Sequence, residues 1–140
     1  MTLQKLNAYG KAFQLKVLGS LLTDKAFLLN IRDVLKEEYF DSDAHKWIIK
    51  QVVEYFDKYH TTVTMDVLKV ELQKVENDVL QVALKEELRN SYQSSQDDLE
   101  YVQEEFHNFC KNQEMKGAIL NSADLFWFYF GFILVFESDF

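Results

Sequence analysis

The sequence predicts an all-α fold: a compact orthogonal helical bundle of about five helices, followed by one long helix. The 140 residues include no proline and only four glycines, a composition that permits long helices and allows few tight turns. Apolar residues also recur at spacings of three and four along most of the chain, as they do on the inward face of a helix. The length suits a single domain.

The first two helices are predicted over residues 8–22 and 23–35. The first carries an inward stripe of Ala12, Leu15, Leu18 and Leu22, flanked by Val17 and Leu21. Gly19 lies inside this stripe, where glycine costs about 1 kcal/mol relative to alanine, so a close approach of another helix is the expected compensation. Thr23 or Asp24 caps the second helix, whose inward residues are Phe27, Leu28, Ile31 and Leu35.

Three further helix starts are predicted from capping residues. Ser42 caps a helix that runs to about Tyr59, with Ile48, Val52, Tyr55 and Tyr59 in its stripe. Thr64 caps the next, with Val63 expected to pack on Leu68 as a hydrophobic staple. A fifth helix begins at Asn77 and carries Leu80, Leu84 and Leu88 on one face.

The long helix follows the polar linker of residues 90–96. Ser95 and Asp98 have the spacing of a capping box, and the helix is expected to reach about Ala123. Its first apolar residues, from Leu99 to Phe109, alternate spacings of three and four, as in helices that pack lengthwise on one another. We place a partner interface on this row and on two apolar residues further along; the alternative is burial against the chain's own head. The predicted interface residues are Leu99, Val102, Phe106, Phe109, Met115 and Ile119.

Charge and cysteine content narrow the function classes. A net charge of −8 without a dense Lys/Arg run makes the chain a poor ligand for phosphate backbones, so any role on DNA is expected to be indirect. Cys110 is the only cysteine, so no intrachain disulfide can form, and a reducing cytoplasm is the expected compartment. No phosphate-binding loop, dinucleotide turn, nucleophile elbow or zinc-protease helix occurs, and we predict no catalytic residue and no cofactor.

Candidate residues for metal binding or acid–base chemistry are few and lack partners. Glu104 and His107 stand three residues apart, as in di-metal carboxylate bundles, but the nearest second pair is Asp57 with His60 at a helix end. His107 and Cys110 lack a second zinc-ligand pair. His45 has no nucleophile at a recognisable spacing. We therefore predict no metal site, with a helical di-metal protein as the less favoured alternative.

Several segments, in order, resemble the N-terminal domain of DnaB-type replicative DNA helicases, including divergent phage versions. "VLGSLLTDKAFL" is similar to the family's opening helix pair, "LKEEYFDSDAHKWIIKQV" to the acidic-Phe segment before a helix, and "TTVTMDVLKVEL" to the lead into the next helix. Residues 99–125 resemble the first helix of the family's helical hairpin. Gln14 departs from the frequent Glu, and the loop before Thr64 lacks the family's frequent proline.

The resemblance implies a collar domain that forms homo-oligomers through the hairpin and docks primase or a helicase loader, in the cytoplasm of a bacterium or a phage-infected cell. ATP hydrolysis belongs to a motor domain that this sequence lacks, so the chain alone is not expected to be an enzyme. A stand-alone helical interaction module, outside this family, is the competing hypothesis. The expected segments are a head over 1–95, a hairpin-type helix over 96–125 and an apolar tail over 126–140.

The apolar run "LFWFYFGFILVF", residues 125–136, makes up most of the tail together with the residue before the tail. It is unlike the polar second hairpin helix expected there. Twelve residues are too few to span a bilayer, which needs about twenty, so no membrane association is predicted. A strand is possible, but an apolar helix packed back onto the head is favoured, with Gly131 as its weak point. The change in composition suggests a truncation or a reading-frame change in this segment.

Overall fold

A computed structural model describes the backbone of residues 6–138, with side chains described over 6–122 and at 125, 127, 130 and 131. Over this part of the chain every regular element is helical, which confirms the all-α prediction. The elements are η1 (Leu6–Tyr9), α1 (Lys11–Thr23), α2 (Lys25–Ile31), η2 (Glu37–Tyr39), α3 (Asp43–Tyr59), α4 (Met65–Gln73), α5 (Asp78–Tyr92) and α6 (Leu99–Ser138).

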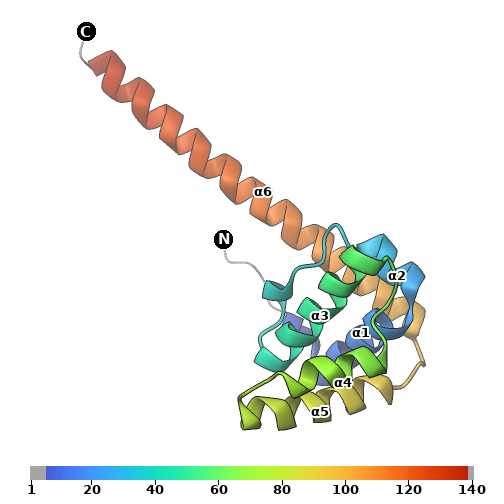
Figure 1. Ribbon diagram of the computed structural model, residues 1–140. Coiled ribbons are helices and arrows are strands. Elements are labelled where there is room, and N and C mark those ends of the chain that lie inside the picture. The colour runs from blue at the N-terminus through green and yellow to red at the C-terminus, as the bar shows by residue number, and fades with distance from the viewer. Residues whose placement is uncertain (1–5, 139–140) are drawn as a thin grey trace.

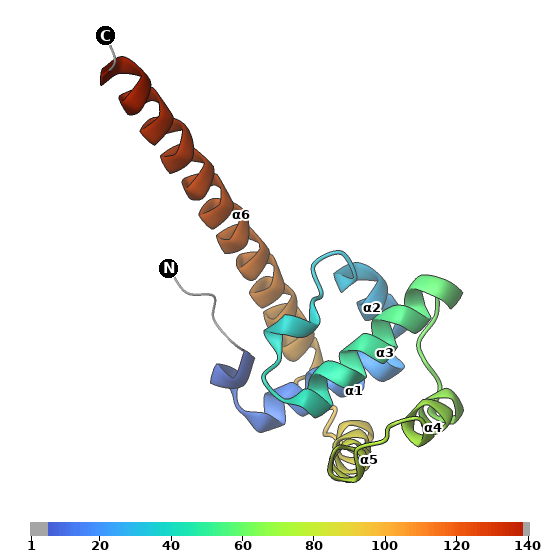
Figure 2. The ribbon, with the colours of Figure 1, turned by 60° about the vertical axis from the view of Figure 1, so that its left-hand side comes forward.

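The head is built around α1, which contacts α2, α3, α5, α6 and η1. Helix α3 packs on α5 and η2, and α4 packs on α5 at the edge of the head (Figure 1). Helix α6 begins within the head and then extends away from it as a straight rod in both views (Figure 2). One helix therefore contributes both to the core and to a long projecting arm.

Four predicted helix starts are confirmed by the capping bonds. Side-chain oxygens accept the first-turn amides in each: Asp24 from Phe27 at 3.0 Å, Ser42 from His45 at 3.4 Å, Thr64 from Val67 at 3.3 Å and Asn77 from Leu80 at 3.1 Å. The close approach expected at Gly19 is also present, because a Cβ there would lie 2.5 Å from the carbonyl oxygen of Ser91. Glycine at this position allows α1 and α5 to pack closely.

The capping box predicted at the start of the long helix is wrong. The hydroxyl of Ser95 accepts the amide of Asp97, two residues later, at 3.2 Å. Asp98 has a positive φ of 53°, and the helix begins only at Leu99. The Asp98 carboxylate instead pairs with Lys16 at 2.7 Å, so a contact with α1 determines its position.

Two stripe positions were also assigned wrongly. Ala12 is exposed, whereas Gln14 is buried. The Gln14 side-chain amide donates to the carbonyl oxygen of Gly10 at 3.3 Å. Tyr59 is 54% exposed at the last turn of α3. Both errors lie near helix ends, where the neighbouring helices no longer cover the whole predicted face.

The apolar tail is neither a strand nor packed on the head. Helix α6 continues without a break past Ala123 to Ser138 and points away from the head (Figure 1). Leu125, the first residue of the apolar run, is 58% exposed and Trp127 in the tail is 65% exposed, so the predicted packing against the head is wrong for these residues. The predicted packing of residues 126, 128, 129 and 132–140 lies outside the described side chains.

Candidate functional site

The structure divides the apolar row predicted as a partner interface into two parts. Val102, Phe106 and Phe109 are at most 3% exposed and belong to the core, and Leu99 is half-buried at the start of the helix. Met115 and Ile119 are 56% and 49% exposed. The first four residues therefore contact their own head, and the last two lie on the projecting arm.

Aromatic rings hold the first part of the row in place. Phe106 lies 6.4 Å from Phe27 of α2 and 6.1 Å from Phe40 after η2, measured between ring centroids. Phe109 meets the edges of Tyr9 and Tyr39 at 5.7 Å and 5.6 Å, with interplanar angles of 90° and 87°. Each edge-to-face pair of this kind stabilises the fold by about 0.5–1.5 kcal/mol beyond the effect of burying the apolar area.

Polar contacts attach the same part of α6 to the head. The Gln103 side-chain amide donates to Asp24 at 3.0 Å, through the carboxylate oxygen that does not cap α2. The Tyr9 hydroxyl donates to Glu105 at 3.4 Å. Burial and the Glu105 carboxylate raise the pKa of Tyr9, so the hydroxyl stays protonated as a donor near neutral pH.

Beyond Gln113 the described side chains of α6 are half-buried or exposed. Gln113 is the last buried residue of α6 among the described side chains, and its Oε1 atom has no hydrogen-bond partner among the described residues. Met115 and Ile119 follow, one helical turn apart and on the same face. Leu125 adds further exposed apolar area that the sequence prediction omitted, because the predicted row ended at Ile119.

Cys110 lies in the core beside this row and is not suited to nucleophilic chemistry. Burial raises the pKa of its thiol well above the usual range, so the reactive thiolate is disfavoured. Burial, with a contribution from Cys110, raises the pKa of Tyr39 to about 12. Both groups therefore act as neutral packing elements at neutral pH.

His45 is part of a buried polar contact between α3 and α5. Its Nε2 lies 2.9 Å from the Glu87 carboxylate, and Lys11 approaches the other oxygen of Glu87 at 3.7 Å. Because a carboxylate can only accept, Nε2 is the protonated nitrogen in this arrangement. The His45 ring also meets Phe40 edge-on at 6.2 Å. These contacts link helices, and no Ser or Cys side chain bonds to the His45 ring within the described part of the chain.

The residues considered for metal binding belong to the C-terminal end of α3 and to α6. Asp57 forms a two-pronged ion pair with Arg32, at 2.7 Å and 2.6 Å, and His60 ends α3 in a left-handed conformation. His107 is partly buried, and burial together with nearby Lys111 lowers its pKa. In the described ranges no three His, Cys, Asp or Glu side chains gather as metal ligands would.

The aromatic composition of α6 raises the question of a membrane helix. No described helix combines the length and apolar character needed to cross a bilayer.

A family model described as the DnaB-like helicase N-terminal domain matches residues 14–105. The match runs from the first turn of α1 to the second turn of α6. It therefore covers most of the head and the buried start of α6. No curated protein and no solved structure matches the chain.

Proposed function

The chain belongs to the DnaB-like helicase N-terminal domain family, and on this basis we propose that it is a collar domain that self-associates through the exposed part of α6. In this role it assembles with sister subunits of a replicative helicase and offers docking surfaces to primase or a loader. It takes part in DNA replication through protein contacts, in the cytoplasm, and does not itself hydrolyse ATP.

One observation supports self-association in particular: α6 presents exposed apolar side chains on an arm that its own head does not cover. Met115, Ile119 and Leu125 are each about half exposed or more. Met115 and Ile119 share one face, and a helix that exposes such a pair buries it most simply against a similar helix. In a homo-oligomer the equivalent pair of a second copy is always available.

The overall charge fits a protein-binding role. The chain carries 15 Lys and Arg against 23 Asp and Glu, so it does not resemble the cationic lining of a DNA channel. A collar that contacts other proteins does not need such a lining.

Sedimentation velocity over a range of concentrations tests the proposal. We expect species larger than the monomer that increase with concentration, and a shift toward monomer for Met115→Ser/Ile119→Ser. The control is Leu29→Ser/Val70→Ser, which removes similarly exposed apolar side chains from α2 and α4. A wild-type chain that stays monomeric at the highest concentration, or equal effects of the two double variants, would refute the proposal.

A further inference from the structure

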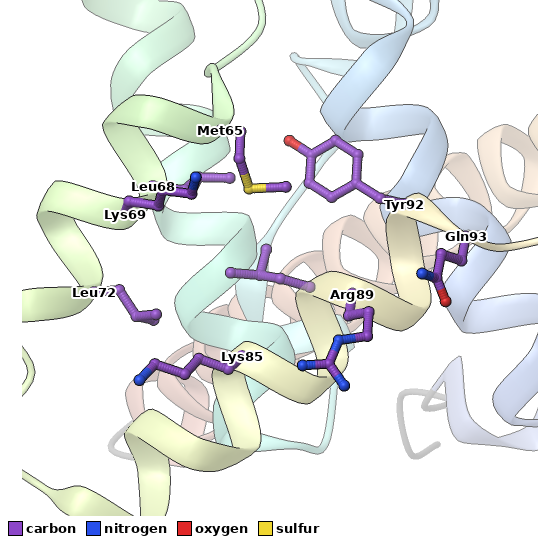
Figure 3. A pocket seen from close by; sticks show the side chains of 9 residues that line it. Met65, Leu68, Lys69, Leu72, Lys85, Arg89, Tyr92 and Gln93 are labelled. Carbon is purple, nitrogen blue, oxygen red and sulfur yellow. The ribbon is translucent and has the colours of Figure 1, made fainter.

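An apolar groove lies between α4 and α5, on the edge of the head away from α6 (Figures 1 and 3). Its volume is about 450 Å³, within the range of sites that accept ligand side chains. The lining residues are Met65, Leu68, Lys69, Leu72, Lys85, Leu88, Arg89, Tyr92 and Gln93. The apolar periodicity of the sequence does not reveal this groove, because it reports only the inward faces of the two helices.

The floor of the groove is rigid and apolar. Leu68, Leu72 and Leu88 are at most 7% exposed and are part of the core, so they cannot move aside easily. Met65 and Tyr92 point toward one another from α4 and α5 at the mouth of the groove (Figure 3). Met65 is 39% exposed, and methionine adapts readily to the shape of a bound side chain.

The rim of the groove is cationic. Lys69, Lys85 and Arg89 are exposed, and no Asp or Glu is among the lining residues. Within the described part of the chain none of the three forms an ion pair, whereas Lys16, Arg32 and Lys74 all do. The groove therefore has three basic side chains without an ion pair at its rim, although the chain as a whole has a net charge of −8.

We propose that this groove binds an acidic amphipathic helix of a partner protein. The apolar side chains of that helix, spaced at i, i+3 or i+4 and i+7, would occupy the groove. Its flanking Asp and Glu residues would pair with Lys69, Lys85 and Arg89. The inference deepens the proposed function and rests on it in one respect, since it assigns a docking site on a domain proposed to bind partner proteins.

A helix is favoured over an extended peptide because of the backbone. The groove lies between two helices whose backbone groups bond within each helix, and Gln93 is the only lining residue with a side-chain amide. An extended peptide would place its amides and carbonyls against apolar side chains without partners. A helix satisfies its own backbone groups and can present only side chains.

A nucleic acid is a poorer fit to the same surface. Single-stranded nucleic acid is bound by a long cationic track with several aromatic platforms, and here a single tyrosine, Tyr92, lines the groove. An apolar floor provides no contacts that would stabilise a phosphate backbone.

The test uses the full chain and fluorescent peptides of about eighteen residues, five helical turns. Three peptides carry Leu, Ile or Phe on one face and Glu elsewhere, and matched peptides carry Lys in place of Glu. Fluorescence anisotropy measures binding at low and high salt. We expect at least one acidic peptide to bind, more weakly at high salt, and the basic peptides not to bind.

Charge-reversal variants locate the site. Lys69→Glu/Lys85→Glu/Arg89→Glu is expected to weaken binding about tenfold or more. The control Lys25→Glu/Lys50→Glu/Lys111→Glu changes the net charge equally at exposed positions outside the groove and is expected to weaken binding by about twofold or less. Met65→Ser tests the apolar part, and circular dichroism confirms that each variant is folded.

Several results would overturn the proposal. These are the absence of binding by every acidic peptide, equal losses in the two triple variants, or tighter groove-dependent binding of a single-stranded oligonucleotide. Loss of self-association in the groove variant would instead make a second copy the occupant. Sedimentation of the same samples separates the two hypotheses: a monomer that binds the peptide refutes self-association alone, and an oligomer that does not bind it refutes the groove alone.

Discussion

The two halves of α6 differ both in the side of the helix that carries their apolar residues and in their surroundings. From Val102 to Gln113 the inward positions are almost completely buried, whereas Met115 and Ile119, which follow, are about half exposed. Met115 and Ile119 lie on nearly the opposite side of α6 from Phe106, and η1, α2 and η2 supply aromatic rings to Phe106 and Phe109. Apolar side chains at helical spacing therefore indicate a face that can be buried and do not indicate which chain buries it.

The largest expected effect tests the buried half. Phe106→Ala removes a fully buried ring that contacts Phe27, Phe40 and Phe109, so we expect a loss of about 3–5 kcal/mol in the free energy of unfolding. Urea denaturation measures it. Met115→Ala is the matched change in the exposed half, and at protein concentrations where the chain is monomeric it should alter stability by less than about 0.5 kcal/mol. Similar losses for both variants would show that the two halves do not differ as described.

The sequence predicted the local features of the fold more reliably than the long-range ones. Asp24, Ser42, Thr64 and Asn77 were identified as caps because a cap depends on residues only three positions away. The cap predicted at Ser95 is wrong, and Asp98 instead forms an ion pair with Lys16, 82 residues away in the chain. Such a contact has no signature in local spacing.

Helical spacing predicted part of the division of α6, because the spacing of three and four is interrupted between Phe109 and Met115. Phe106 and Ile119 are 13 positions apart, about three and a half turns, so they lie on nearly opposite sides of α6, and the head packs on the side of Phe106. The apolar tail was predicted to fold back, yet no proline interrupts the backbone, and an unbroken helix keeps its hydrogen bonds satisfied. Gly131 lies within this helix and does not end it.

Glycine substitutions extend the comparison to the backbone. Gly19→Ala would place a Cβ 2.5 Å from the Ser91 carbonyl oxygen and 2.9 Å from the Ser94 hydroxyl, so we expect α1 and α5 to separate at a cost of about 1–3 kcal/mol. Gly117→Ala on the projecting arm meets nothing within 4 Å and should stabilise the helix by about 0.5–1 kcal/mol. Thermal unfolding compares the two variants. A neutral Gly19→Ala would refute the close packing of α1 on α5.

A smaller effect is expected at the attachment of α6 to the head. Asp24→Ala removes the cap of α2 and the acceptor for Gln103 together, whereas Thr64→Ala removes only the cap of α4. Each cap contributes about 1 kcal/mol, and the Gln103 bond adds about 0.5–1.5 kcal/mol. We therefore expect Asp24→Ala to destabilise the chain by about 0.5–1.5 kcal/mol more than Thr64→Ala does, measured by urea denaturation. Equal losses would mean that the Gln103 contact contributes nothing.

The smallest effect is expected at the Arg32–Asp57 pair, which lies on the head and does not contact the arm. The Arg32 guanidinium lowers the pKa of Asp57 from its ordinary value of 3.8, so the pair stabilises the fold above that pH, and the contribution is lost as the pH falls through the lowered pKa. Because both side chains are partly exposed, Asp57→Asn should cost less than about 1 kcal/mol near neutral pH.

The same variant should match the wild-type chain in acid, where the wild-type carboxyl is protonated, and it should leave self-association unchanged. Chemical denaturation at several pH values checks the first point. A difference in stability that grows as the pH falls would mean that the ionised Asp57 carboxylate does not stabilise the fold.

Hydrogen exchange measured by mass spectrometry at increasing protein concentration shows whether the two halves of α6 are buried by different chains. We expect amides around Phe106 and Phe109 to be protected at every concentration, while protection around Met115 and Ile119 rises as the chain associates. Protection of residues 115–119 that stays the same at all concentrations, whether high or low, would contradict burial of this half by a second copy.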